Sequence, residues 1–192
     1  MNNTDRGPGP SMQRYRSHSG RPGQGERAVD GPPWRGWPAV ALWFGLTGAA
    51  AAVGMLASGL APSFYASLQK PVWAAPAWLF GPAWTVLYLL MACAAVMVHR
   101  RQGDGAQAGL ALRWYVVALL PNALWSWTFF RWHQGALSLA VILTLLLLLV
   151  TTVVAFRRAH HTAAALMLPV TLWVGYASAL NLALLRLNPG LL

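Results

Sequence analysis

The chain has little charge, few acidic residues and a single cysteine. Only 9% of its 192 residues are charged and 57% are hydrophobic, whereas an ordinary soluble domain carries about 25% charged residues. A core this apolar would be hard to surround with polar surface, so the composition excludes an ordinary soluble globular protein. The one cysteine, Cys93, cannot form an intramolecular disulfide and says nothing about the redox compartment.

Charge is absent altogether from five long intervals. They are Trp37–Leu60, Trp78–Val98, Trp114–Phe130, Gly135–Phe156 and Thr162–Leu185. Each is near the roughly 20 helical residues that cross a bilayer, and the third is interrupted by Pro121 and Asn122. Strands of a membrane β-barrel would be about half as long and would alternate in polarity. The sequence therefore predicts an all-α integral membrane bundle of five transmembrane helices.

Residues 1–36 have a different composition, rich in Gly, Pro, Ser and Arg and nearly empty of aliphatic side chains. Such a segment cannot bury enough apolar surface to fold, so we expect a disordered tail. It has no short apolar core of the kind found in a cleavable signal peptide. The predicted organisation is a disordered tail over residues 1–36 followed by a five-helix membrane domain over residues 37–192.

Basic residues are distributed unevenly between the two sides of such a bundle. Three of them, Lys70, Arg131 and Arg186, fall on one side, and eleven fall on the other, in the tail and in the second and fourth loops. This bias predicts a cytoplasmic N-terminus and an outer C-terminus in a plasma or inner cell membrane. A nucleic-acid-binding surface typically has a stripe of basic residues interleaved with aromatics, and the sequence outside the tail has no such stripe. We therefore do not expect nucleic-acid binding.

Three of the predicted helices carry large aromatics beside hydrogen-bonding groups at four-residue spacing, which places them on one face. The sets are Trp84 with Tyr88, Asn122 with Trp125 and Ser126, and Trp173 with Ala177 and Asn181. Taken alone, each set is better explained by helix packing or by an interfacial aromatic belt than by a binding site. Together they favour a pocket for a flat, mostly apolar ligand, because aromatic faces stack on planar rings and a few polar groups fix orientation.

The segment before the second interval is rich in proline and aromatics and contains Lys70, Pro71, Trp73 and Pro76. Because a proline biases the preceding residue away from helix, we expect an ordered cap over one end of the bundle. Lys70 has two interpretations that the sequence leaves open. It meets an acidic ligand group or a lipid phosphate, or it extends along the apolar surface to the membrane interface.

Three motifs in order, KPVWAAPAWLFGPAWTVLYLLMA, PNALWSWTFF and LPVTLWVGYASALNLALLRLN, resemble the TspO/MBR family of tryptophan-rich sensory proteins over about residues 38–189. The resemblance implies a five-helix bundle, a homodimer, and a pocket that binds porphyrins, haem and benzodiazepine-site ligands. By motif position it implies that the ligand-binding residues are Tyr65, Trp84, Tyr88, Asn122, Trp125, Ser126, Trp173 and Ala177.

The chain departs from the family pattern at two places. Ala75 stands where the family usually has the first proline of a KPxWxPP loop, which predicts a less rigid cap. Leu182 stands where the cholesterol motif of animal members requires a tyrosine, so we do not expect cholesterol recognition.

Three classes of function are compatible with these features. The first is a tetrapyrrole receptor or sensor that acts in tetrapyrrole regulation or stress response. The second is a light- and oxygen-dependent porphyrin-degrading activity that uses Trp84 and Trp173, and the third is a transporter of porphyrins or other amphipathic ligands. The intervals contain no carboxylate, metal cluster or nucleophile–base pair, which argues against a conventional enzyme. No histidine lies within them, so ring stacking should dominate over axial ligation of haem iron. We expect no required cofactor, no resident metal, and tetrapyrroles and membrane lipids as partners.

Overall fold

The computed structural model describes residues 37–59, 61–101 and 106–191, so the predicted tail over residues 1–36 lies outside the described residues. Helices are the only regular secondary structure within these ranges. They are α1 (Trp37–Ala57), α2 (Ala61–Ser67), α3 (Ala77–His99), α4 (Ala106–Ser126), a π-helical turn η3 (Trp127–Arg131), α5 (Gly135–Ala159) and α6 (His161–Leu187). The prediction of an all-α membrane bundle is confirmed.

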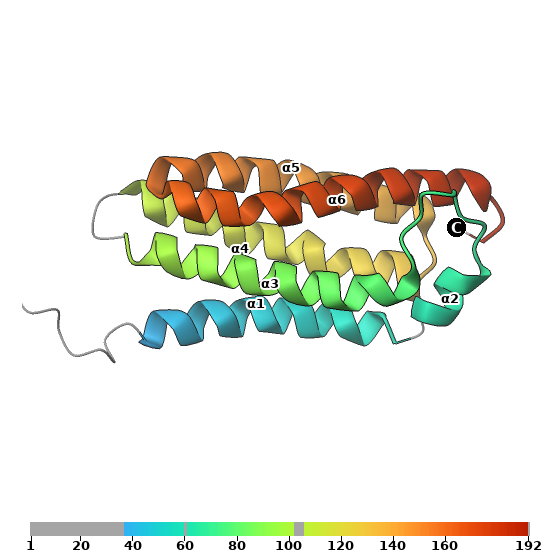
Figure 1. The fold of residues 1–192 in the computed structure, drawn as a ribbon, viewed down its shortest axis with the longest axis horizontal. Coiled ribbons are helices and arrows are strands. Elements are labelled where there is room, and N and C mark those ends of the chain that lie inside the picture. The colour runs from blue at the N-terminus through green and yellow to red at the C-terminus, as the bar shows by residue number, and fades with distance from the viewer. Residues whose placement is uncertain (1–36, 60, 102–105, 192) are drawn as a thin grey trace, which may run out of the picture. The chain divides into compact units, whose positions relative to one another are not determined.

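The five long helices lie side by side, and the short helix α2 sits at one end of them (Figure 1). Helix α5 packs against α4 and α6, α3 packs against α1 and α6, and α1 also packs against α4. The C-terminus of α3, the N-terminus of α4 and the α5–α6 junction lie at the end of the bundle away from α2 (Figure 1). This arrangement brings the three aromatic sets predicted from the sequence into one bundle.

The predicted number of membrane spans is off by one when judged by helix length and composition. Among the described helices, four are long and apolar enough to cross a membrane, namely α1, α3, α5 and α6. Helix α4 is long enough at 21 residues, but it contains Gln107, Arg113, Pro121 and Asn122, which make it less apolar than the other four. It nevertheless runs alongside the other long helices within the bundle (Figure 1).

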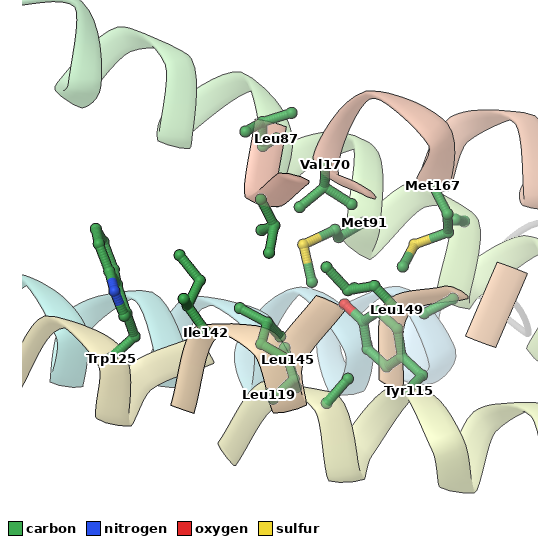
Figure 2. Close-up of a cluster of buried hydrophobic side chains, with 14 of the residues drawn as sticks. Leu87, Met91, Tyr115, Leu119, Trp125, Ile142, Leu145, Leu149, Met167 and Val170 are labelled. Carbon is green, nitrogen blue, oxygen red and sulfur yellow. The ribbon is translucent and has the colours of Figure 1, made fainter. Parts of the chain in front are cut away.

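The core lies among α3, α4, α5 and α6. Met91, Tyr115, Leu149 and Met167 are fully buried there, and Figure 2 shows their side chains pointing toward one another. Small residues recur at the same contacts, including several fully buried alanines: Ala94, Ala95, Ala111 and Ala163. Small side chains let helix backbones approach closely, which is how membrane helices associate without a hydrophobic driving force.

Candidate functional site

A cavity of about 630 Å³ lies between α1, α3 and α4, with α2 at one end. This volume is within the range of small-molecule pockets. Most of the site residues predicted from the sequence line it: Tyr65, Trp84, Tyr88, Asn122, Trp125 and Ser126. Two helices thus contribute the aromatic and polar side chains that the four-residue spacing placed on common faces.

The centre of the cavity wall is a hydrogen-bonded pair from α3 and α4. The Tyr88 hydroxyl donates to Oδ1 of Asn122 over 2.5 Å, and the Trp84 ring lies 5.4 Å from the Tyr88 ring, tilted by 31°. Because Oδ1 accepts this bond, the orientation of the Asn122 amide is fixed. The pair therefore combines a flat aromatic surface with one oriented polar group.

Two hydrogen-bond donors on the wall have no partner among the described residues. They are Nδ2 of Asn122 and Nε1 of Trp125, and both are buried. Leaving a buried donor unsatisfied costs about 1–3 kcal/mol. Neither nitrogen is accessible from the cavity, so a ligand acceptor offsets that cost only when the side chain rotates.

The cavity wall is uncharged. None of the described residues that line it is Asp, Glu, Lys, Arg or His. Its polar atoms are hydroxyl, amide and indole groups, and the remainder is aromatic or aliphatic. Charged groups of a ligand would be stabilised only at the opening, since burying an unpaired charge is expensive.

The structure does not place Trp173 and Ala177 on this wall. The Phe80 ring lines the cavity and lies 5.8 Å from the Trp173 ring, so Trp173 packs behind Phe80. Ala177 lines a separate small cavity of about 10 Å³. Tyr65, Phe80, Trp125 and Phe130 line both cavities, so these side chains lie between Ala177 and the main cavity.

Helix α1 supplies the wall that sequence reasoning assigned to α6. Phe44, Thr47, Gly48, Ala51 and Gly54 all line the cavity. These lining residues comprise one aromatic and four small side chains. In the sequence, that combination does not distinguish a cavity wall from an ordinary helix–helix contact. The only available signal was the recurrence of small residues at helical spacing, which is equally typical of helix–helix contacts.

Lys70 has a local role that neither sequence interpretation included. Its Nζ donates to the carbonyls of Tyr65, Ala66 and Leu68 over 2.9, 3.2 and 2.7 Å, and it lies 5.3 Å from the centre of the Tyr65 ring. These carbonyls belong to the last turn of α2 and the residue just after it, where helix carbonyls lack partners. Lys70 thus caps the C-terminus of α2, where a cation is also favoured by the helix dipole.

Residues 68–76, which we term the cap segment, are fastened to both the cavity wall and α6. The Tyr65 hydroxyl donates to the Ala75 carbonyl over 2.8 Å, and the Ala75 N–H donates to the Tyr176 hydroxyl over 2.7 Å. Asn188 binds the Gln69 backbone twice, over 2.8 and 3.0 Å. The ordered cap predicted from the prolines is therefore fixed by hydrogen bonds from α2 and α6.

Burial, with a smaller contribution from Tyr176, raises the pKa of Tyr65 to about 12. The Tyr65 hydroxyl therefore stays protonated at physiological pH and keeps donating to Ala75. The bond between the cavity wall and the cap segment is consequently insensitive to pH across that range.

The lining contains few residues that could ligate haem iron. None of the described lining residues is His or Cys, and those of a ligating type are Met55, Tyr65 and Tyr88. The two tyrosine hydroxyls are engaged with Ala75 and Asn122. The sequence argument missed Met55, because it considered only histidine as an iron ligand.

The chain is similar to known proteins over most of its length. The model of the TspO/MBR family matches residues 39–187. The chain is 36% identical over 150 residues to Protein CrtK of Rhodobacter capsulatus, covering 78% of this chain and 92% of that protein. It is 36% identical over 153 residues to the Tryptophan-rich sensory protein of Cereibacter sphaeroides, covering 79% and 92%. It is 31% identical over 160 residues to the Translocator protein of Sus scrofa, covering 83% and 94%.

Proposed function

The chain belongs to the TspO/MBR family of integral membrane proteins, and on that premise we propose that it is a receptor or sensor for tetrapyrroles of the porphyrin or haem type. The observation that carries this proposal is the uncharged aromatic cavity between α1, α3 and α4. Its size, flat walls and few polar groups suit a planar, largely apolar ring system.

The ligand's ring stacks on the surface made by Trp84 and Tyr88. Two of the buried nitrogens without a partner belong to lining residues, Asn122 Nδ2 and Trp125 Nε1. After a small rotation of its side chain, either one donates a hydrogen bond to an acceptor atom on the ring edge. The ring carboxylates lie at the opening, because the described lining residues provide no cation to pair with them. Exposed lining residues such as Met55 and Trp78 mark that opening.

Binding is tested by titrating the purified protein with protoporphyrin and following the porphyrin absorption band. We expect Trp84→Leu and Asn122→Leu each to weaken binding about tenfold or more, equivalent to about 1.4 kcal/mol. The matched control is Trp132→Leu, because Trp132 is exposed and does not line the cavity. Equal affinity in the wild type and the Trp84→Leu protein would contradict the proposal.

Stacking and axial ligation predict different responses to iron. If stacking dominates, protoporphyrin binds at least as tightly as haem, and Met55→Leu leaves the two affinities in the same ratio. A large preference for haem that disappears in Met55→Leu would show that the thioether ligates the iron, and would replace the stacking account.

A second candidate function is photochemical breakdown of bound porphyrin, favoured by the position of Trp84 and Trp125 on one cavity wall. Illumination of the complex with oxygen, followed by absorption spectra, tests it. Spectral conversion that is lost in Trp84→Phe and Trp125→Phe but kept in Trp173→Phe would support it, since Trp173 lies behind Phe80. Bleaching equal to that in detergent alone would leave a receptor without turnover.

A further inference from the structure

Four rings from four helices contact one another toward the end of the bundle that lies away from α2. The Trp43 ring of α1 lies 5.9 Å from the His99 ring of α3 and 5.8 Å from the Tyr115 ring of α4. The Tyr115 ring in turn stacks on the Phe156 ring of α5, with 6.0 Å between the ring centres. These contacts place the four residues at one height along the bundle.

Four exposed arginines lie within two residues of these rings in the sequence: Arg100, Arg113, Arg157 and Arg158. Two residues of helix correspond to about 3 Å, so the arginines share the height of the rings. We term these four residues the arginine belt. Within the described part of the chain, no carboxylate is present to pair with them.

The arginine belt faces away from the core of the bundle. Residues two positions apart on a helix are separated by about 200° around its axis. Arg113 is therefore on the side of α4 opposite Tyr115, and Arg158 is on the side of α5 opposite Phe156. Because Tyr115 and Phe156 are fully buried, these two arginines extend toward the surroundings of the bundle.

The height of the arginine belt matches one surface of a bilayer. After Arg113, the next charged residue in the sequence is Arg131 at the end of η3. The helix between them is about 27 Å long at 1.5 Å per residue, close to the roughly 30 Å of a hydrocarbon core. A bilayer with Arg131 at one surface thus has Arg113 at the phosphates of the other. Trp114, which is 36% exposed, is a residue type enriched at that interface.

From this geometry we propose that the arginine belt is a binding surface for the headgroups of anionic phospholipids. A guanidinium binds a phosphate through two parallel hydrogen bonds, and a basic residue is attracted to a negatively charged leaflet. Phosphatidylcholine is a poorer occupant, because its choline group cancels the charge of its phosphate. A soluble acidic protein is also a poorer occupant, because it would have to enter the headgroup layer to reach Arg113. The described lining of the cavity includes none of the four arginines, so this surface is separate from the proposed ring site.

The test uses the full chain, without porphyrin, in phosphatidylcholine vesicles that contain traces of phospholipid spin-labelled near the end of one acyl chain. Electron paramagnetic resonance measures the fraction of the labelled lipid that is immobilised against the protein. Averaged over the lipids around the bundle, we expect phosphatidylglycerol to associate at least about twofold more strongly than phosphatidylcholine, since one arginine contributes about fivefold at its own site. The preference should shrink as the salt concentration rises, because salt screens exposed charges.

Two double variants that remove the same charge make the test specific. Arg113→Gln with Arg158→Gln removes half of the arginine belt and should bring the preference for phosphatidylglycerol at least halfway down to none. Arg131→Gln with Arg186→Gln is the matched control, since it removes two exposed arginines from the other end of the bundle, and it should keep the preference. The label is present in both leaflets, so the orientation of the chain in the vesicle does not affect the comparison.

Three outcomes would overturn the proposal. They are the absence of a preference in the wild type, an equal loss in the two double variants, and a preference that is unchanged when Arg113 and Arg158 are replaced. The last outcome would assign the preference to other basic residues of the chain. None of these outcomes bears on protoporphyrin affinity, which is measured separately.

Discussion

At the scale of single residues, the peptide of Ala75 joins the cavity wall to α6. Its carbonyl accepts from Tyr65 and its N–H donates to Tyr176. A proline at this position, as in the family pattern, has no N–H and could not make the second bond. The alanine therefore replaces the rigidity of a proline by a hydrogen bond, and the expectation of a looser cap omitted this compensation.

Removing that bond should loosen the cap segment in a way that depends on which partner is changed. Tyr176→Phe leaves the Ala75 N–H without an acceptor, which costs about 1–3 kcal/mol for a buried group and less where water reaches it. We expect faster amide exchange over residues 71–76 and a lower unfolding temperature. Ala75→Pro removes the N–H donor together with the bond, so no donor is left unsatisfied. We therefore expect a smaller change in amide exchange and in unfolding temperature than in Tyr176→Phe. Unchanged exchange in Tyr176→Phe would show that the bond does not hold the cap segment.

Residue spacing predicted which side chains face inward better than it predicted which neighbour they meet. Tyr88 and Asn122 lie on inward faces of two adjacent helices, and they bind each other directly. Trp173 is on an inward face as well, but Phe80 separates it from the cavity. A helical period fixes the angle of a side chain around its own axis, whereas the order of helices around the cavity depends on tertiary packing that no local pattern encodes.

At the scale of elements, the short helix α2 depends on Lys70 for its C-terminal cap. We expect Lys70→Met to increase amide exchange in Ala61–Ser67, because the carbonyls of Tyr65 and Ala66 lose a donor. The expected loss of stability is about 0.3–1 kcal/mol, since the interaction is largely exposed. Lys70→Arg keeps a cation and serves as the conservative control.

The same variant distinguishes a capping lysine from one that pairs with a ligand carboxylate. Binding of protoporphyrin and of its dimethyl ester should change by the same factor in Lys70→Met if Lys70 acts only on α2. A loss confined to the free acid would show a direct ion pair and would restore the first interpretation drawn from the sequence.

The contact between α1 and α4 is set by Gly54. A Cβ added there would lie 3.3 Å from Ser126 Oγ and 3.9 Å from Ala123 Cα, so Gly54→Ala should push against Ser126. Gly48→Ala has open space and should gain about 1 kcal/mol of helix propensity without a clash. We expect Gly54→Ala to unfold at a lower temperature than Gly48→Ala, and Ser126→Ala to rescue it. Equal unfolding temperatures in the two single variants would show that α1 and α4 separate freely.

Element boundaries were predicted closely where a charge or a proline marks the edge of a span. The interval Gly135–Phe156 gave a close estimate of α5 because Arg157 and Arg158 end the apolar run within the last turn. Helix α4 extends past Arg113 to Ala106 because the Arg113 side chain is exposed and interrupts no packing. The absence of charge thus locates the apolar middle of a helix, while hydrogen bonding and exposure decide where the helix begins.

At the scale of the whole molecule, the described part of the bundle contains no carboxylate side chain, since all four acidic residues fall outside the described ranges. Its cohesion comes from close packing and from hydrogen bonds between helices, such as Tyr115 with Thr47 and Asn181 with Ser138. Asn181, one of the polar residues singled out in the sequence, therefore joins α5 and α6 rather than facing the cavity. With no carboxylates among the described residues, the charges that determine the orientation of the bundle in the membrane are those of the basic residues.

Five arginines lie at the α3–α4 and α5–α6 end of the bundle: Arg100, Arg101, Arg113, Arg157 and Arg158. The opposite end has Lys70, which is engaged with α2, and the exposed residues Arg131 and Arg186. Because positive loops are retained on the cytoplasmic side, we expect the arginine-rich end to face the cytoplasm.

Cysteine accessibility in intact cells tests this orientation. In a Cys93→Ala background, His161→Cys reports the arginine-rich end and Gly190→Cys reports the other end, and both positions are exposed. A membrane-impermeant maleimide should label Gly190→Cys in intact cells, and His161→Cys only after lysis. Replacing Arg157 and Arg158 by alanine reduces the bias of the described basic residues from five against three to three against three, so a fraction of molecules should then invert. Labelling of His161→Cys in intact cells with all arginines present would show that the bundle has the opposite orientation, with the cap segment on the cytoplasmic side.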